Sequence, residues 1–200
     1  MTVEIRPYRP GDLDALHDIC LKTGDNGADG THLYADHRII GEIFAAPYAV
    51  LEPQHAFVAE DEHGVGGYIL GAADTRAFEA RCEAEWWPAL RARHADTADV
   101  PSWKRTREQW DAYYIHHPPP NPQAVVEIAP AHLHIDLLPR LQGQGVGKAL
   151  MDRWLAAIGG PAHLGCQAPN HRAQRFYERY GWRRLEGVEP KAVVWMTHGV

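Results

Sequence analysis

The pattern of apolar and polar positions predicts strands at both ends of the chain. Apolar and polar residues alternate over residues 3–8, which is typical of a half-buried strand. Two further runs, residues 57–59 and 65–73, are separated by a turn and predict a hairpin. Short apolar runs predict four later strands, at residues 131–138, 163–167, 182–185 and 192–197.

Helical spacing occupies the segments between these strands. Apolar residues after Asp12 recur three and four positions apart, which indicates a first helix that Asp12 is expected to cap. Gly181 is placed to end the last helix. Further helices are predicted at residues 37–45, 77–95, 102–114, 145–158 and 170–180. Because strands alternate with helices, the sequence predicts one α/β domain over residues 1–200, built on a single sheet.

The segment at residues 76–124 interrupts this alternation, and we interpret it as a helical insertion. It contains two of the predicted helices and ends in a stiff proline-rich stretch at residues 117–122. Four of the seven tryptophans lie in it: Trp86, Trp87, Trp103 and Trp110. They are expected to bury a small core of the insertion itself. The alternative is that they form a wall for a substrate.

Composition and charge narrow the class of protein. The 200-residue chain has 45% apolar residues, enough for a buried core, and a formal net charge of −6. It lacks the basic stripe of a nucleic-acid binder, and no run approaches the roughly 18 apolar residues of a membrane span. Its three cysteines form no CxxC pair, and residues 1–10 lack the apolar segment of a signal peptide. We therefore expect a cytoplasmic protein with no nucleic-acid or membrane partner.

A glycine-rich loop follows the strand predicted at residues 131–138. Gly143, Gly145 and Gly147 lie at alternate positions where the next helix begins. Unpaired N–H groups and the helix dipole favour an anion at such a point, and missing Cβ atoms let it approach closely. A pyrophosphate fits this site. A tight turn with close helix packing is the alternative.

Two common nucleotide-binding loops do not match this stretch. The phosphate-binding loop GxxxxGK[ST] is excluded because Gln142 stands in place of its first glycine and Ala149 in place of its hydroxyl residue. The dinucleotide motif GxGxxG is excluded by the spacing GxGxG and by the late position in the chain. The loop therefore indicates an anion site without naming its ligand.

Two stretches of the chain resemble the motifs of the GNAT acetyltransferase superfamily. Residues 142–147, QGQGVG, resemble its pattern Q/R-x-x-G-x-G/A. Residues 170–182 resemble its later motif N-x-x-A-x-x-x-Y-x-x-x-G-F, with Trp182 in place of Phe. The order of strands and helices is also similar, apart from the insertion. The resemblance implies the GNAT fold, a mixed central sheet of about seven strands flanked by helices, with the insertion before the central cofactor-binding strand.

The end of the chain resembles more narrowly the acetyltransferase-like C-terminal domain of O-GlcNAcase and its bacterial stand-alone relatives. The stretches that carry this resemblance are residues 176–179, Gly181, and residues 186–187, 190–191 and 193–194. This group of relatives includes domains for which catalytic activity is not established. A catalytically silent acetyl-CoA-binding module is therefore the alternative to an enzyme. A nucleotide binder without acyl chemistry is a third option. The complete glycine loop favours cofactor binding.

The GNAT resemblance implies an N-acetyltransferase that uses acetyl-CoA as co-substrate and no metal. Backbone groups of Leu137 and Leu138 would hold the pantetheine arm like an added strand. Asn170 would cap the last helix and contact the same arm. Tyr177 would give a proton to the leaving thiolate, unless it is only a packed aromatic residue. The loop residues expected at the pyrophosphate are Gln142, Gly143, Gln144, Gly145, Val146, Gly147 and Lys148.

The base that takes the proton of the attacking amine is expected among Glu127, His134 and Asp136, and we assign it to Asp136. His132, His134 and Asp136 project from one face of the predicted strand at a period of two. This row is expected to face the cleft or the solvent. The alternative is a metal site.

The loop between the first two helices carries Asp25 and Asp29. In related folds this loop lines the acceptor site, so the two carboxylates are expected to attract a cationic acceptor. As the alternative, they are plain turn formers. The sequence leaves the acceptor as an unidentified amine, and it leaves open a homodimer through the surface of the insertion.

Overall fold

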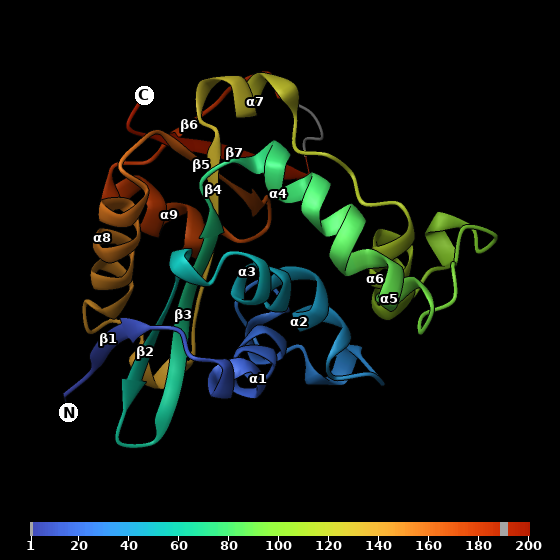
Figure 1. Ribbon diagram of the computed structural model, residues 1–200, viewed down its shortest axis with the longest axis horizontal. Helices are drawn as coiled ribbons and strands as arrows, with labels where there is room; N and C mark the ends of the chain where they lie inside the picture. Colours follow the sequence, from blue (N-terminus) through green and yellow to red (C-terminus); the bar gives the residue numbers. More distant parts are fainter. Residues whose placement is uncertain (1, 189–191) are drawn as a thin grey trace.

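The computed structural model describes residues 2–188 and 192–200, and Figure 1 shows how its elements are arranged. Residues 190–191, part of the narrower resemblance, lie outside the described residues. The strands are β1 (Glu4–Pro7), β2 (Ala56–Asp61), β3 (Gly64–Ala72), β4 (Ala131–Leu137), β5 (Ala162–Gln167), β6 (Arg183–Arg184) and β7 (Val193–His198). They form one seven-stranded sheet in the order β1-β2-β3-β4-β5-β7-β6. Among the described strands only β4 and β5 pair in parallel, so the sheet is mixed, as predicted.

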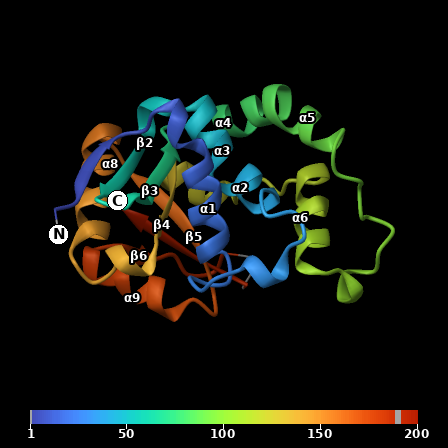
Figure 2. The same cartoon turned by 90° about the horizontal axis from the view of Figure 1, so that it is seen from below.

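Helices cover both faces of this sheet (Figures 1 and 2). They are α1 (Leu13–Thr23), α2 (Ile39–Phe44), α3 (Ala46–Leu51), α4 (Thr75–Arg81), α5 (Trp87–Arg91), α6 (Arg107–His116), α7 (Gln123–Ile128), α8 (Val146–Ile158) and α9 (His171–Tyr180). Successive residues of a strand point to opposite faces. Val58 and Tyr68 therefore join the core beneath α1, α2 and α3, and their neighbours Phe57 and Ile69 join the core beneath α8 and α9.

Most predicted elements are present, but the helix predicted at residues 77–95 is divided into α4, a π-helical segment at Cys82–Trp86 and α5. Two further differences concern α2 and α7. The helix predicted at residues 37–45 is α2, and α3 follows it directly. Pro47 lies in the first turn of α3 and cannot continue a helix from α2, so the chain bends at Ala45, which has φ −128° and ψ −58°. The second difference is α7, which has only 6 residues. Helical periodicity is read over roughly 11 residues or more, so α7 gives no signal of its own.

Asp12 precedes α1 as predicted, but its side chain does not cap that helix. Its carboxylate accepts hydrogen bonds from both terminal nitrogens of the buried Arg6, each at 2.8 Å, and from the N–H of Arg9 at 2.7 Å. The hydrogen bonds from Arg6 lower the pKa of Asp12. The carboxylate therefore joins the start of α1 to β1 through a buried ion pair.

The insertion packs on the rest of the domain, so the prediction that it forms a core of its own is wrong. Trp87 and Ile115 are buried in the same apolar cluster as α1, α2 and α3. Trp86 donates from Nε1 to the backbone carbonyl of Glu42 on α2, at 2.8 Å. The helix α6 packs against α2, and α5 packs against α6, because neither short helix can form a core alone. The other two tryptophans of the insertion are exposed: Trp103 and Trp110.

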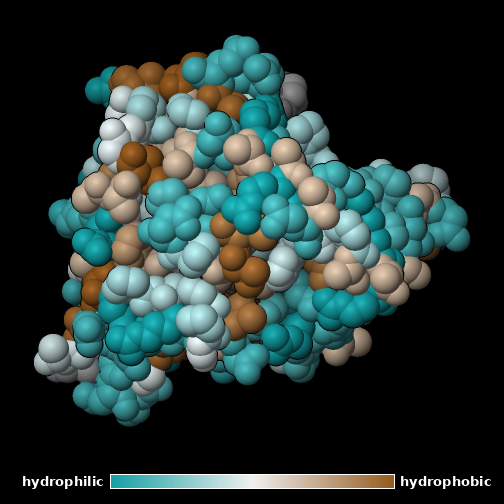
Figure 3. All heavy atoms as spheres, viewed as in Figure 1, coloured by the Kyte–Doolittle hydropathy of each residue, from teal (hydrophilic) through white to brown (hydrophobic). Residues whose placement is uncertain are grey.

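Hydrophilic residues cover most of the face seen in Figure 3, where the hydrophobic areas are small and separate. The three cysteines, Cys20, Cys82 and Cys166, are buried and unpaired. None of the helices in the described ranges is long and apolar enough to cross a membrane.

Candidate functional site

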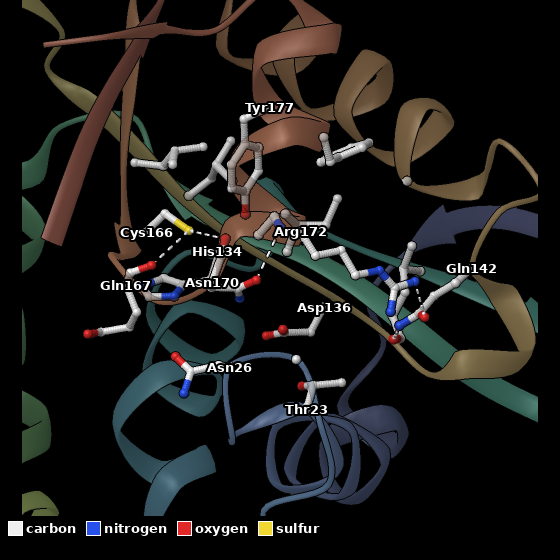
Figure 4. A pocket seen from close by; sticks show the side chains of 18 of the residues that line it. Thr23, Asn26, His134, Asp136, Gln142, Cys166, Gln167, Asn170, Arg172 and Tyr177 are labelled. Atoms are coloured by element: carbon white, nitrogen blue, oxygen red, sulfur yellow. Dashed lines mark hydrogen bonds between the residues drawn. The ribbon is translucent and has the colours of Figure 1, made fainter.

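The parallel strands β4 and β5 separate after two residue pairs and open a cavity between them. The last pair in the described sheet joins His132 to His163. Beyond it, residues 133–137 of β4 and 164–167 of β5 line a cavity of about 600 Å³. Figure 4 shows this cavity, with Tyr177 of α9 pointing into it. The point at which strand pairing stops therefore creates the site.

The edge of β4 that faces the cavity has backbone groups that no described strand pairs. Ala131 donates its N–H to the carbonyl of Pro161 on the β5 side, at 3.4 Å. Leu138, just past the strand, donates its N–H to Gly66 on the β3 side, at 2.8 Å. Because successive residues direct their N–H groups to opposite edges, the backbone N–H groups of the odd-numbered residues of β4 point to the edge that faces the cavity. An extended ligand can add to this edge as a further strand would.

Of the two leucines expected to hold a ligand, Leu137 lies in the cavity wall and Leu138 does not. The N–H of Leu138 is bonded to Gly66, and its carbonyl accepts the N–H of Leu141 at 2.9 Å. The second bond closes the 3-10 turn at Pro139–Leu141. Both backbone groups of Leu138 are therefore engaged within the protein, and the expected contact falls to Leu137 alone.

The glycine-rich loop joins β4 to α8 and leaves a row of N–H groups unpaired. Gly145 is the N-cap of α8 and has no side chain to cap it. Within the described ranges, the backbone N–H groups of residues 143–148 have no hydrogen-bond acceptor. The 13 residues of α8 add a dipole whose positive end lies at this loop. The loop therefore has the geometry that favours an anion, and anion binding there stays a prediction.

The three glycines of the loop are needed for two different reasons. Gly143 and Gly145 have φ of 75° and 82°, and an added Cβ would meet nothing within 4 Å at either. Backbone conformation explains these two. At Gly147 an added Cβ would lie 3.3 Å from side-chain atoms of Leu137 and Phe176. Close packing of α8 against β4 and α9 explains this third glycine.

Gln142 connects the loop to the elements on both sides of it. Its Nε2 donates to the carbonyl of Leu137 at 2.7 Å, and its Oε1 accepts from Arg172 on α9 at 2.5 Å. Gln144 donates to a backbone carbonyl within the loop at 2.6 Å, and Val146, the first residue of α8, is buried in the core. The structure thus places the side chain of Gln142 in the cavity wall and those of Gln144 and Val146 outside it.

Positive side chains gather around the cavity although the chain is acidic overall. The charged residues in its described walls are four cations and one carboxylate: Arg107, Lys148, Arg172, Arg179 and Asp136. Lys148 also forms an exposed ion pair with Asp152, at 2.6 Å. A cavity whose walls carry mostly positive charge, in a chain of net charge −6, favours an anionic ligand.

Asn170 and Tyr177 come together on the α9 side of the cavity. Asn170 caps the helix as predicted, because its side-chain oxygen accepts the N–H of Ala173 at 3.1 Å. The hydroxyl of Tyr177 points into the cavity and bonds to none of the described residues drawn in Figure 4. Burial raises the pKa of Tyr177 well above its usual range. The phenol is therefore protonated at neutral pH and available as a donor.

Asp136 of β4 lies in the same cavity, as Figure 4 shows. Its Oδ2 accepts a hydrogen bond from the hydroxyl of Tyr68 at 2.7 Å. Burial raises the pKa of Asp136 to about 6, against the opposing effect of that hydrogen bond. A carboxylate that titrates this close to neutrality is suited to accept a proton during a reaction.

The other two candidates for the base are placed differently from one another. His134 lines the cavity, and burial lowers its pKa to about 4, so its ring is neutral. Glu127 is exposed on α7, where it accepts a hydrogen bond from Gln123 at 2.8 Å. The structure thus brings Asp136 and His134 to the cavity and leaves Glu127 outside its described walls.

The predicted row on β4 divides between the core and the cavity. The rings of His132 and His134 both contact Tyr48, with centroids 5.4 and 5.2 Å away, so they share one face of the strand. His132 is bonded to the hydroxyls of Tyr48 at 2.9 Å and Thr75 at 2.8 Å. In the part of the chain that the structure describes, no group of three His, Cys, Asp or Glu residues could hold a metal ion.

The loop between α1 and α2 lines the cavity through residues other than the two that were predicted. Asn26 and Gly27 lie in the wall, and Asp25 and Asp29 are not among the described wall residues. Asp29 accepts the N–H of Thr31 at 2.8 Å, which is the contact of a turn former. The attraction of a cationic acceptor to these two carboxylates stays a prediction.

Sequence reasoning missed Arg172, Arg179 and Thr23 in the cavity wall. The two arginines have the same seven-residue spacing as Asn170 and Tyr177, about two helical turns. This spacing predicts that they share one side of α9, but they stand two positions after Asn170 and Tyr177 and so not on the face of the motif residues. Thr23 gave no such signal, because its place at the cavity depends on how the end of α1 packs against the sheet.

Comparisons with known proteins agree with this geometry. A family model described as an acetyltransferase (GNAT) domain matches residues 120–184. The chain is similar to Protein O-GlcNAcase of Rattus norvegicus, with 25% identity over 198 residues, which are 95% of this chain and 21% of that protein. The chain thus spans about a fifth of the length of the curated relatives it matches.

Solved structures extend the similarity over the whole chain. The crystal structure of SsHAT has 37% sequence identity and a TM-score of 0.89, and the match covers 99% of this chain and 98% of that one. A PaiA N-acetyltransferase from Thermoplasma acidophilum, solved in complex with coenzyme A, has 13% identity and a TM-score of 0.59, with 100% of both chains covered. The second likeness concerns the fold alone.

Proposed function

Because the chain belongs to the GNAT acetyltransferase family, we propose that it is an N-acetyltransferase that transfers the acetyl group of acetyl-CoA directly to an amine. One observation carries the proposal. The unpaired edge of β4 leads to the unpaired N–H groups of residues 143–148, and the Tyr177 hydroxyl faces the same cavity. A strand edge that ends at an anion site suits a ligand with an amide-containing arm attached to a pyrophosphate.

Each part of acetyl-CoA would find a different partner in the cavity. The amides of the pantetheine arm would pair with the odd-numbered residues of β4. The pyrophosphate would lie on the N–H groups of residues 143–148 at the start of α8. Lys148, Arg172 and Arg179 would supply positive charge for the phosphates. Asn170, which lines the same cavity, would lie beside the arm.

The reaction would be a direct transfer within one complex. The amine nitrogen attacks the thioester carbonyl carbon, a C–N bond forms, and the C–S bond then breaks to release coenzyme A as a thiolate. A backbone N–H of the unpaired edge, at the end of that edge away from the glycine loop, would stabilise the negative oxygen of the intermediate. Asp136 takes the proton of the attacking amine, and Tyr177 gives its proton to the thiolate. Exchange with solvent restores both groups.

The alternative is a silent module that binds acetyl-CoA without turning it over. The presence of Asp136 and the Tyr177 hydroxyl in one cavity supports the enzyme. An assay of thiol release over a panel of amines separates the two. An enzyme releases coenzyme A only when an amine is present, whereas a silent module binds acetyl-CoA and releases none.

We expect kcat/KM to fall as the pH drops through about 6, because Asp136 accepts a proton only as a carboxylate and its pKa is raised to about 6. Asp136→Asn should remove this acid limb and lower kcat/KM about 100-fold. Steady-state kinetics across the limb measure both effects. Glu127→Gln removes a carboxylate outside the cavity walls and should keep the wild-type profile. A limb that persists in Asp136→Asn, or one centred near pH 4, would transfer the role to His134.

Asp136→Asn should also stabilise the fold above pH 6. An unfolded aspartate titrates near pH 4, so between about pH 4 and 6 the folded chain holds a proton that the unfolded chain has lost. Ionisation of Asp136 at higher pH therefore costs roughly 3 kcal/mol of folding free energy, from the difference between about 6 and 3.8. Denaturant unfolding should show this gain for Asp136→Asn at pH 8 and little gain near pH 4. A variant less stable than wild type at pH 8 would contradict the raised pKa.

A further inference from the structure

A second cavity meets the first where β4 and β5 separate. It has a volume of about 560 Å³ and lies between these strands, α2, α3 and the insertion. Phe44, Leu133, His134, Leu164 and Gly165 line both cavities. The two spaces therefore meet at residues that also border the proposed reaction centre.

The walls of the second cavity are aromatic and stiff. Tyr48 and Phe78 are stacked with ring centroids 4.3 Å apart. Trp87 of α5 meets Tyr114 of α6 edge to face, at 6.3 Å. The proline-rich residues 118–122 close another side. Aromatic and prolyl side chains lose little entropy when a ligand orders them, and aromatic walls favour a ring-shaped apolar body.

The carboxylates in these walls are already paired. Glu79 accepts from Arg76 at 2.6 Å and from the backbone and side chain of Asn121 at 2.8 and 2.9 Å. Glu83 forms a two-point ion pair with Arg91. No other Asp, Glu, Lys or Arg is among the described residues of these walls. The body of a ligand in this cavity would therefore have no counter-charge to meet.

His134 stands at the junction of the two cavities. Its ring contacts Phe44 and Tyr48, with centroids 5.9 and 5.2 Å away. Because burial lowers the pKa of His134 to about 4, its neutral ring does not repel an approaching ammonium group. Asp136 follows two residues later on the same strand face. An amine that enters through the second cavity would pass His134 and reach Asp136.

Building on the proposed function, we propose that the second cavity holds the acceptor and that this acceptor is a small primary amine with an uncharged aromatic body. Its ring would lie between the Tyr48–Phe78 and Trp87–Tyr114 pairs, with the nitrogen extended past His134 toward the thioester. Two other classes of amine fit less well. A polyamine would bring a second positive charge to walls whose carboxylates are paired. A lysine side chain is unbranched and would leave most of about 560 Å³ unfilled.

Binding to the protein loaded with coenzyme A tests this assignment without requiring turnover. Calorimetric titration of the saturated protein should show saturable binding of tryptamine and 2-phenylethylamine. Spermidine and a lysine-containing peptide should bind at least about tenfold more weakly. Equal or tighter binding of spermidine or the peptide, or no binding of tryptamine, would overturn the assignment. Failure of the wild-type protein to bind coenzyme A would count instead against the proposed function.

Variants of the aromatic walls locate the binding site. Tyr114→Leu keeps most of the side-chain bulk but removes the aromatic face, and should weaken tryptamine binding about fivefold while coenzyme A affinity stays unchanged. Phe44→Leu, at the junction, is a second variant if the first does not fold. Trp103→Leu is the control, because Trp103 is an exposed aromatic residue of the same insertion, outside both cavities. Wild-type tryptamine affinity in folded Tyr114→Leu or Phe44→Leu would place the amine elsewhere.

Discussion

Replacing Tyr177 by phenylalanine should lower kcat about 100-fold and leave the affinity for acetyl-CoA unchanged. The change removes only a hydroxyl that faces the cavity and is protonated at neutral pH. Without it the thiolate must leave unprotonated. The ring stays packed against Phe176 and Trp182, with centroids 5.4 and 6.3 Å away, so stability should change little. Thiol release gives the rate and calorimetry gives the affinity.

Tyr180→Phe is the matched control for this experiment. Tyr180 lies on the next turn of α9, and its hydroxyl donates to Asp152 at 2.6 Å, outside the described cavity walls. This variant should keep the wild-type kcat, so an equal loss in both variants would point to a general effect on α9. An unchanged kcat in Tyr177→Phe would exclude the general-acid role and leave Tyr177 as a packed aromatic residue.

Gly145→Glu should weaken acetyl-CoA binding at least about 100-fold, or about 2.7 kcal/mol. The new carboxylate would stand at the N-terminus of α8, where the phosphates would lie, and would repel them. The backbone of Gly145 has φ of 82°, which costs a side-chain-bearing residue about 1–2 kcal/mol of stability. Calorimetry with acetyl-CoA measures the affinity, and thermal unfolding confirms that the variant is folded.

Gly159→Glu controls for that backbone strain. Gly159 caps the other end of α8 with φ of 68°, and an added Cβ would meet nothing within 4 Å, as at Gly145. A carboxylate is favourable at a helix N-terminus and unfavourable at a C-terminus, so Gly159→Glu should be the less stable variant. It should nevertheless bind acetyl-CoA as the wild type does. Wild-type affinity in Gly145→Glu would contradict the anion site.

The parts of the fold that could be predicted are those with a local pattern of apolar residues and with residues that begin or end an element. The hairpin of β2 and β3 has alternation and a turn, and α9 has its cap at Asn170 and its stop at Gly181, where φ is 116°. The place of the insertion could not be predicted. Trp86 binds the backbone of Glu42, 44 positions away, and no local pattern reports a contact at that distance along the chain.

The candidate site was predictable as far as motif spacing reaches. The loop glycines, Asn170 and Tyr177 follow from it, and the structure brings them to one cavity. The shape of that cavity depends on where β4 and β5 stop pairing, after His132 and His163. The period of a strand predicts the side of the sheet to which each side chain points, but it does not predict where two strands separate. For the second cavity the sequence offered the alternative that tryptophans of the insertion form a substrate wall, and Trp87 is the one of them that lines it.

The central claim is acetyl transfer, and one measurement tests it most directly. The protein is incubated with acetyl-CoA and a panel of amines, and mass spectrometry quantifies free coenzyme A together with acetylated amine. We predict equal amounts of both products, with release that depends on the amine. Binding of acetyl-CoA without any amine-dependent release would contradict the claim in favour of a silent module, and binding of ATP without binding of coenzyme A would contradict the cofactor itself.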